Sequence, residues 1–192
     1  MAVLLLVDLS RSTANTVYGS RATVLEVEQE AIVLFCEALA VVGDAFAIAG
    51  FSGTGRLGVD YCRIKDFDEA VTDAVRGRIN AMAPQRSTRM GAAIRHATRQ
   101  LAQVPARVRL LIILGDGFPN DVNYKKAYAI ADTRRAIFEA RSRAIHTHAI
   151  TVNLAADPNL DALYGDVHHN VISDVRELPD KLLRIYSALT RS

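Results

Sequence analysis

The stretch VLLLVDLSRSTAN, residues 3–15, begins with five branched apolar residues and reaches an aspartate at its sixth position. This run predicts a strand over residues 2–8 that is apolar on both faces, as is typical of a central strand in a parallel sheet. Three hydroxyl residues, Ser10, Ser12 and Thr13, follow the aspartate within five positions. The polar segment has three open interpretations: an ordinary turn, a catalytic nucleophile with its helpers, or half of a metal site.

The length of 192 residues predicts a single domain with a sizeable core of its own. The formal net charge of +2 provides no basic surface for nucleic acid. Cys36 and Cys62 are too few for a disulfide framework, so we expect free thiols in a reducing compartment. No apolar run reaches membrane-spanning length and the N-terminus lacks a cleavable leader, so we expect a cytoplasmic protein without a membrane partner.

The rest of the sequence alternates between strand-like and helix-like segments. We expect strands at residues 2–8, 45–51, 57–64, 108–117, 144–152 and 170–172. We expect helices at residues 24–42, 68–80, 89–103, 132–143 and 178–190. Asp132 is the expected cap of the fourth helix, and the second and third strands are expected to form a hairpin. This order predicts an α/β fold: a doubly wound, mostly parallel six-stranded sheet with one antiparallel edge strand and helices on both faces.

Candidate ligand residues follow two of the apolar strands. Sheets of this kind bind ligands beyond the carboxyl ends of their strands, and Asp8 and Asp116 each end an apolar strand. The D-x-S-x-S spacing turns Asp8, Ser10 and Ser12 the same way, and Thr88 contributes a hydroxyl from a third segment. Such oxygens suit a hard cation such as Mg²⁺, which takes about six oxygen ligands. The alternative is that these residues only cap a turn, but three converging segments favour the metal site.

Two other patterns have plainer explanations. The GTGRLG segment at residues 53–58 matches a dinucleotide-binding pattern but leads into a strand instead of a helix, so we interpret it as a hairpin turn. His146 and His148 share one face of a strand, but no cysteine or further histidine has the spacing of a zinc site. We expect these to be packing or surface histidines, and we expect the same of His168 and His169, which we place in a loop.

An enzymatic interpretation also fits part of the sequence. Asp8 and GDGFPND at 115–121 resemble the haloacid-dehalogenase-like phosphatases, which use an aspartyl nucleophile and a Mg²⁺-binding GDGxxD segment. In that family a second aspartate, two residues after the first, serves as the general acid. Ser10 stands at that position here, so the proton donor is missing. The phosphate-site lysine of that family is absent as well, because no lysine occurs between residues 66 and 124. We therefore favour a binding function over phosphatase activity.

The segments DLSRS (8–12), TRMGAAIRHA (88–97) and DGFPND (116–121) resemble the von Willebrand factor A domain, and the resemblance covers essentially the whole chain. In that family these segments form the metal-ion-dependent adhesion site. The metal ligands that the resemblance implies are Asp8, Ser10, Ser12, Thr88 and Asp116. It also implies that the hydroxyls contact Mg²⁺ directly, with Mn²⁺ or Ca²⁺ as alternatives, that one or both aspartates act through water, and that an acidic residue of the partner completes the shell.

The sequence departs from the family's pattern in two places, at residue 115 and in the segment YKKAYAIA at residues 124–131. Gly115 stands where many such domains carry Thr or Ser before the aspartate. Lys125 and Lys126 stand where relatives are more often acidic or glycine-containing. Neither departure removes a ligand.

The longer strings TRMGAAIRHAT, DGFPNDVN and DTRRAIFEAR resemble the NorD/CbbO group of bacterial adaptors, which work with hexameric MoxR-type AAA+ ATPases. The segment at residues 168–190 is most similar to the rubisco-activation branch, CbbO. The resemblance implies a non-enzymatic module that recruits rubisco to such an ATPase. The alternative is the equivalent adaptor for nitric oxide reductase activation, NorD. Residues 1–192 are then expected to be one such domain, at the C-terminal end of a longer adaptor.

Overall fold

A six-stranded sheet forms the middle layer of the computed structural model, which describes residues 1–17, 20–152, 163–164, 168–172 and 177–190. The strand order is β3-β2-β1-β4-β5-β6. The strands are β1 (Ala2–Asp8), β2 (Ala45–Thr54), β3 (Gly58–Lys65), β4 (Arg109–Gly115), β5 (Ile145–Val152) and β6 (His168–Ile172). β2 and β3 are antiparallel and every other neighbouring pair is parallel. The predicted fold class, including the antiparallel edge strand, is therefore confirmed.

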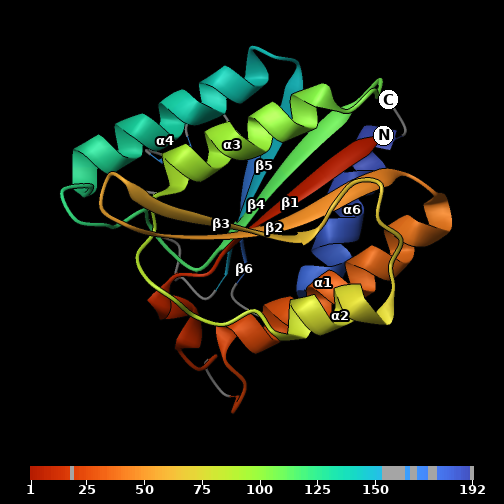
Figure 1. The fold of residues 1–192 in the computed structure, drawn as a ribbon, viewed down its shortest axis with the longest axis horizontal. Coiled ribbons are helices and arrows are strands. Elements are labelled where there is room, and N and C mark those ends of the chain that lie inside the picture. Colours follow the sequence, from red (N-terminus) through yellow and green to blue (C-terminus); the bar gives the residue numbers. More distant parts are fainter. Residues whose placement is uncertain (18–19, 153–162, 165–167, 173–176, 191–192) are drawn as a thin grey trace.

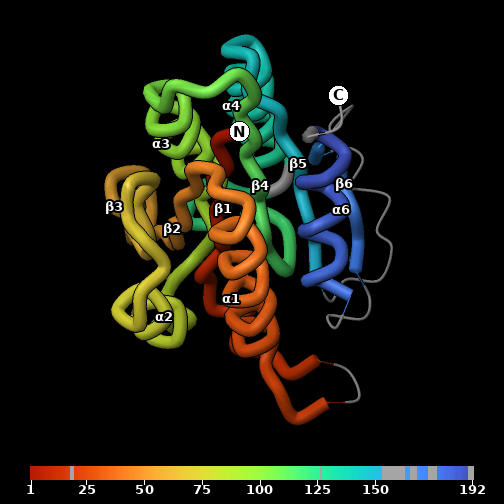
Figure 2. Tube along the Cα trace, turned by 90° about the vertical axis from the view of Figure 1, so that its right-hand side faces the viewer, coloured from red at the N-terminus to blue at the C-terminus, as the bar shows by residue number. Residues whose placement is uncertain are grey.

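Helices cover both faces of this sheet (Figure 1). The helices are α1 (Val24–Val42), α2 (Asp73–Asn80), α3 (Met90–Gln103), α4 (Lys126–Arg141) and α6 (Leu178–Thr190), with a short 3₁₀ helix η1 (Arg11–Ala14). Figure 1 shows α3 and α4 on one face and the other three α-helices on the opposite face, and Figure 2 shows α1 between α2 and α6. Within the described ranges, no helix combines the length and the apolar character needed to cross a bilayer.

The central strand β1 contributes to two hydrophobic cores. Val3, Leu5 and Val7 pack into the core beneath α1, α2 and α6. Ala2, Leu4 and Leu6 alternate with them and pack into the core beneath α3 and α4. Full burial of each Leu or Val contributes about 1.5–3 kcal/mol. This double burial explains the unbroken apolar run and fixes the place at which the strand ends.

The first helix begins close to this strand end, and its start is defined by a capping box. Thr23 Oγ1 accepts a hydrogen bond from the Glu26 N–H (3.2 Å), and Glu26 Oε2 accepts one from the Thr23 N–H (2.7 Å). Two N–H groups that the helix itself cannot satisfy thus have partners. Gly43, with a φ of +80°, ends the helix in the left-handed conformation that glycine adopts without strain. The predicted helix at 24–42 is confirmed at both ends.

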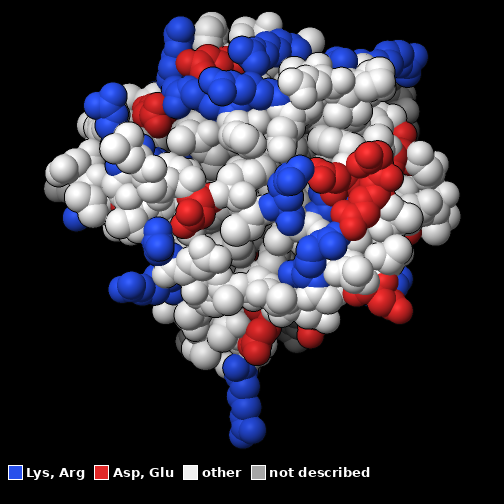
Figure 3. Space-filling view, in the orientation of Figure 1, with Lys and Arg blue, Asp and Glu red and all other residues white. Residues whose placement is uncertain are grey.

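Helices α3 and α4 pack closely against each other. A Cβ on Gly91 would lie 2.1 Å from Asp132 Oδ2, so this position has no room for a larger residue. Arg95 of α3 forms ion pairs of 2.8 Å with both Asp132 and Glu139 of α4. In Figure 3 both basic and acidic side chains lie on the face in view, and the whole chain has 23 Lys and Arg against 21 Asp and Glu.

Several predicted boundaries are wrong. Strand β2 continues to Thr54 instead of ending at residue 51, and β4 spans Arg109–Gly115 instead of 108–117. Helix α4 begins at Lys126 instead of Asp132, because the Asp132 carboxylate accepts hydrogen bonds from Tyr124 and Arg95 instead of capping its own helix. Helix α2 begins at Asp73 instead of residue 68. His168 and His169 lie in strand β6 instead of a loop, because parallel pairing with β5 extends two residues before the apolar NVI segment.

Both cysteines are free thiols, as expected. Cys36 is buried in α1, where burial raises the pKa of its thiol to about 12. It is therefore protonated at neutral pH and is not a nucleophile.

Replacing Thr23 by Ala removes the side-chain half of the capping box and should lower the free energy of unfolding by about 1 kcal/mol. The matched control is Thr72→Ala, because Thr72 is the N-cap of α2 but makes no side-chain capping hydrogen bond. Urea denaturation of both variants measures the difference. Equal losses of stability would contradict the assignment of the cap.

Candidate metal centre

The five predicted ligand residues come together at the carboxyl edge of the sheet. Asp8 ends β1, and Asp116 directly follows the last residue of β4, its neighbour in the sheet. Ser10 and Ser12 lie in the turn and the 3₁₀ helix that follow β1, and Thr88 precedes α3. Three segments that are far apart in the sequence therefore supply one cluster, which we call the oxygen cluster.

Hydrogen bonds connect all members of the oxygen cluster. Asp8 Oδ1 accepts from the Ser10 N–H (2.8 Å), and Asp8 Oδ2 accepts from Thr88 Oγ1 (3.1 Å). Ser12 Oγ donates to Asp116 Oδ1 (2.9 Å) and lies 3.1 Å from Ser10 Oγ. The hydrogen bonds thus run from Asp8 through Ser10 and Ser12 to Asp116, and Thr88 joins the oxygen cluster at Asp8.

The surroundings of Asp8 and Asp116 disfavour ionisation of both carboxyl groups at the same time. Burial raises the pKa of Asp8 to about 7, and the negative charge of Asp116 contributes further, against hydrogen bonds from Ser10 and Thr88. Burial also raises the pKa of Asp116. A cation among these oxygens would offset both effects, because an opposite charge favours the ionised form of a carboxyl group.

The donor set fits a hard divalent cation. It consists of two carboxylates and three hydroxyls, all oxygen, whereas soft metals prefer sulfur or imidazole ligands. Mg²⁺ takes about six oxygens, so the five side chains leave room for water or for a ligand from another molecule. Asp8, Ser10 and Thr88 are buried, while Ser12 is exposed and Asp116 is half-buried. The oxygen cluster therefore opens to solvent on the side of Ser12 and Asp116.

A second fully buried carboxylate adjoins the oxygen cluster, and the sequence analysis did not identify it. Glu28 of α1 is 0% exposed, and among the residues that the structure describes neither of its carboxylate oxygens has a hydrogen-bond partner. Burial and the charges of Asp116 and Asp8 raise the pKa of Glu28 well above its usual value. In the sequence Glu28 is one of several glutamates between the apolar positions of α1, so nothing in the pattern distinguishes it. An unpaired buried carboxyl at this place is one more observation that fits a nearby cation.

The loop that carries Thr88 is attached to the loop after β4. The Thr88 and Asn120 backbones exchange two hydrogen bonds of 2.9 and 3.0 Å. Arg89 forms a buried ion pair with Asp121 (Nε to Oδ2, 2.8 Å), and its guanidinium lies 4.4 Å above the Tyr124 ring centroid. These contacts explain why arginine follows the ligand threonine, and why aspartate and tyrosine follow GDGFPN.

The position of Asp121 bears on the phosphatase interpretation. Although burial opposes ionisation, hydrogen bonds from Gly55, Arg89 and Val122 lower the pKa of Asp121. In a GDGxxD metal motif the last aspartate would face the cation, but that position is Asn120 here and Asp121 comes one residue later. Here both of its oxygens are engaged by Arg89 and by backbone N–H groups, and it makes no hydrogen bond to Asp8 or Asp116.

Gly115, one of the departures from the family pattern, lies against Asp8. A Cβ at this position would be 3.2 Å from the Asp8 Cβ, tighter than most such contacts. The glycine thus leaves space for the Asp8 side chain.

The remaining sequence candidates lie outside the oxygen cluster. GTGRLG at 53–58 forms the turn between β2 and β3, with Gly55 at a φ of +69°, as the hairpin interpretation predicted. His146 is exposed, and His148 is half-buried, with its Nε2 2.7 Å from Asn170 Oδ1. His146 is therefore a surface residue and His148 a packing residue, as expected.

Comparison with known proteins identifies the family. The model of the von Willebrand factor type A domain matches residues 3–118, so this chain belongs to that family. Domains of this family commonly bind a divalent metal at the site that the oxygen cluster resembles.

The relatives with the most informative names are called NorD. Protein NorD of Brucella suis is 42% identical over 190 residues, which are 98% of this chain and 30% of that protein. Protein NorD of Stutzerimonas stutzeri is 38% identical over 178 residues, or 92% of this chain and 29% of that protein. An uncharacterized protein of Pseudomonas aeruginosa is 42% identical over 192 residues. The chain spans about a third of the length of these curated relatives.

Solved structures support the same fold. The conserved hypothetical protein BatB from Bacteroides thetaiotaomicron superposes with a TM-score of 0.69 at 15% identity, covering 100% of this chain and 99% of that one. The von Willebrand factor type A protein from Catenulispora acidiphila has a TM-score of 0.66 at 19% identity, covering 96% of this chain and 41% of that one. At these identities the likeness establishes the fold only.

The raised pKa of Asp8 predicts a pH-dependent stability in EDTA. Between the ordinary pKa of 3.8 and the folded value of about 7, the folded protein retains a proton that the unfolded chain releases. The contribution of Asp8 to the free energy of unfolding therefore falls as pH rises through this window. Asp8→Asn, which has no such proton, should become more stable than the wild type above the window. Urea denaturation in EDTA across this pH range measures the free energy of unfolding of both proteins. A difference between the wild type and Asp8→Asn that stays constant with pH would contradict the prediction.

Glu28→Gln should raise the stability of the metal-free protein and reduce the stabilisation that Mg²⁺ provides. In EDTA at alkaline pH the variant should gain about 1 kcal/mol, because no carboxylate has to ionise inside the core. Addition of Mg²⁺ should stabilise it less than the wild type, because one negative charge near the cation is lost. Glu30→Gln on the exposed side of the same helix is the control. Thermal melting with and without Mg²⁺ measures both effects, and an unchanged Mg²⁺ response would rule out a role toward the cation.

Proposed function

We propose that this chain is a Mg²⁺-dependent protein-binding module of an adaptor protein and has no catalytic activity of its own. The observation that carries the proposal is the oxygen cluster, which is buried on the side of Asp8 and Thr88 and open on the side of Ser12 and Asp116. A cation held there would keep a free coordination position facing solvent.

The ligand that best fills such a position is a carboxylate of another protein. Hydroxyls and water-mediated aspartates leave much of the charge of the cation uncompensated, so an incoming Asp or Glu gains a strong charge-assisted contact. The isolated module should bind metal weakly, and the metal and the client should each increase the affinity for the other. Domains with this site can therefore act as reversible, metal-dependent clamps.

The names of the relatives favour one client class over the other. Relatives that are 38–42% identical over nearly the whole chain are named NorD. This supports the nitric-oxide-reductase alternative better than the rubisco-activation interpretation based on residues 168–190. We therefore propose that the client is of the nitric oxide reductase type. We also propose that the chain is one domain of a longer adaptor, because it covers about 30% of these relatives.

ATP hydrolysis is assigned in this proposal to a separate partner. The sequence contains no GxxxxGK[ST] phosphate-binding loop. A hexameric MoxR-type AAA+ ATPase, with which the resembling adaptors work, would supply the work of remodelling the client. The phosphatase alternative is disfavoured because Ser10 occupies the general-acid position and Asn120 stands where a GDGxxD motif has its last aspartate.

Titration with Mg²⁺ tests the metal site directly. At Mg²⁺ concentrations ten to a hundred times the Kd, the free energy of unfolding should rise by about 1.4–2.7 kcal/mol relative to EDTA. Asp8→Ala and Thr88→Ala should abolish this gain. Asp68→Ala, which removes an exposed carboxylate outside the oxygen cluster, should keep it. Equal stability of the wild type in Mg²⁺ and EDTA would count against the proposal.

Client capture distinguishes the remaining functions. The wild-type protein should retain nitric oxide reductase subunits in Mg²⁺ but not in EDTA, and Thr88→Ala should retain them in neither. Stronger retention of rubisco would restore the rubisco interpretation. Capture that survives loss of all five ligands would indicate a metal-independent interaction domain. Hydrolysis of phosphate esters that Asp8→Asn abolishes would show an enzyme instead.

A further inference from the structure

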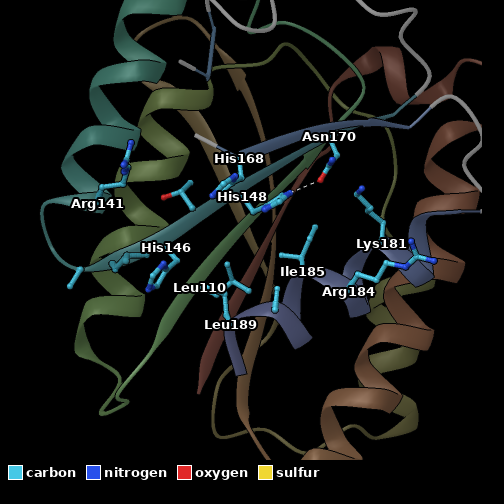
Figure 4. A pocket seen from close by; sticks show the side chains of 14 residues that line it. Leu110, Arg141, His146, His148, His168, Asn170, Lys181, Arg184, Ile185 and Leu189 are labelled. Atoms are coloured by element: carbon cyan, nitrogen blue, oxygen red, sulfur yellow. Dashed lines mark hydrogen bonds between the residues drawn. The ribbon is translucent and has the colours of Figure 1, made fainter. Parts of the chain in front are cut away.

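A pocket of about 680 Å³ lies between α6 and the outer strands β5 and β6 (Figure 4). Leu110 of β4 and Ile145, the first residue of β5, line its end nearest the amino termini of the strands. No member of the oxygen cluster lines it, and the cluster lies at the opposite edge of the sheet. Its volume falls within the roughly 300–1,000 Å³ that small-molecule sites occupy. Any ligand here would thus be separate from the candidate metal centre.

Basic side chains surround this pocket. Arg141, Lys181 and Arg184 line it together with three histidines, and none of the described lining residues is acidic. Elsewhere Arg89 and Arg95 form ion pairs with carboxylates. In the part of the chain that the structure describes, no carboxylate forms an ion pair with the three cations of the pocket. The three cations of the pocket are therefore available to a bound anion.

Histidines form the wall of the pocket on the side of β5 and β6. His148 and His168 come from paired strands and stack with ring centroids 6.1 Å apart, and His148 Nε2 lies 2.7 Å from Asn170 Oδ1. Burial lowers the pKa of His148, and the charges of His168 and Lys181 lower it further. Figure 4 shows Lys181 on α6, across the pocket from His148. The cations that line the pocket disfavour a metal cation beside these histidines and favour an anion, to which a histidine N–H can donate a hydrogen bond.

The pocket also has an apolar part. Leu110, Ile185 and Leu189 gather on one side of it in Figure 4. A ligand with an organic body and a charged end would bury its body there and direct its charge toward α6 and the histidines. Arg and Lys are the usual partners of phosphate groups, which accept several charge-assisted hydrogen bonds at once.

We propose that this pocket binds a small phosphorylated molecule of about nucleotide size. Its phosphates lie between Lys181 and Arg184 on α6 and the histidines of β5 and β6, and its organic part packs on Leu110 and Ile185. This site is independent of the proposed adaptor function, because no residue of the oxygen cluster takes part in it.

Titration with ATP in EDTA tests the site, because EDTA removes the metal from the candidate metal centre. Saturable binding is expected in calorimetry, and amide chemical shifts should change in β5, β6 and α6. Pyrophosphate should compete and adenosine should bind at least about tenfold more weakly than ATP. The double variant Lys181→Gln/Arg184→Gln should bind ATP about tenfold more weakly. Arg56→Gln, an exposed arginine in the β2–β3 turn, is the charge-matched control for one substitution.

Several outcomes would overturn the proposal. One is the absence of saturable ATP binding, and another is an equal loss of affinity in Arg56→Gln and in the double variant, which would indicate non-specific attraction. Shift changes confined to residues around Asp8 would place binding elsewhere. Tighter binding of a poly-glutamate peptide than of ATP at the same residues would indicate a site for an acidic protein segment instead. Thermal melting of the double variant shows whether it is folded, so a loss of affinity can be interpreted.

Discussion

The central strand β1 is buried on both faces and pairs with β2 on one side and β4 on the other. Because no side chain of this strand can reach water, the first polar group that follows its apolar run stays at the edge of the sheet. That group is Asp8, and the parallel neighbour β4 brings Asp116 to the same edge. The position of the candidate metal centre thus follows from the packing of the two cores, and the loops only add hydroxyl groups to it.

The same burial makes ionisation of the nearby carboxyl groups unfavourable. Asp8, Asp116 and Glu28 have raised pKa values because they are withdrawn from water, and the charge of Asp116 raises the pKa values of Asp8 and Glu28 further. The folded protein therefore tends to hold protons where a cation would otherwise neutralise the charge. Metal affinity should increase with pH, since metal and protons compete for the same oxygens. The domain thus sacrifices some stability to keep a site that favours a divalent cation.

Much of this arrangement could be predicted from the sequence, because it follows from hydrophobic periodicity. The apolar runs of β1 and β4 defined the sheet, and D-x-S-x-S with Thr88 and Asp116 named five side chains that the structure brings together. Hydrophobic periodicity could not predict the start of α4 or the burial of Glu28, because both depend on tertiary contacts. Asp132 has the residue type of a helix cap, but Tyr124 and Arg95 bind its carboxylate. Glu28 looks like any surface glutamate, and only the packing of α1 shows that it is buried.

The ion pair between Arg89 and Asp121 has a further consequence. Asp121 is buried, whereas the next residue, Val122, is 58% exposed, and Arg89 Nη2 also holds the Val122 carbonyl (3.0 Å). The backbone of this loop is therefore fixed while its outward side chains remain unconstrained. A substitution at Val122 can therefore change the surface of this loop without moving the backbone that holds Thr88 in the oxygen cluster. The chemistry of this surface and that of the oxygen cluster can thus vary independently of each other.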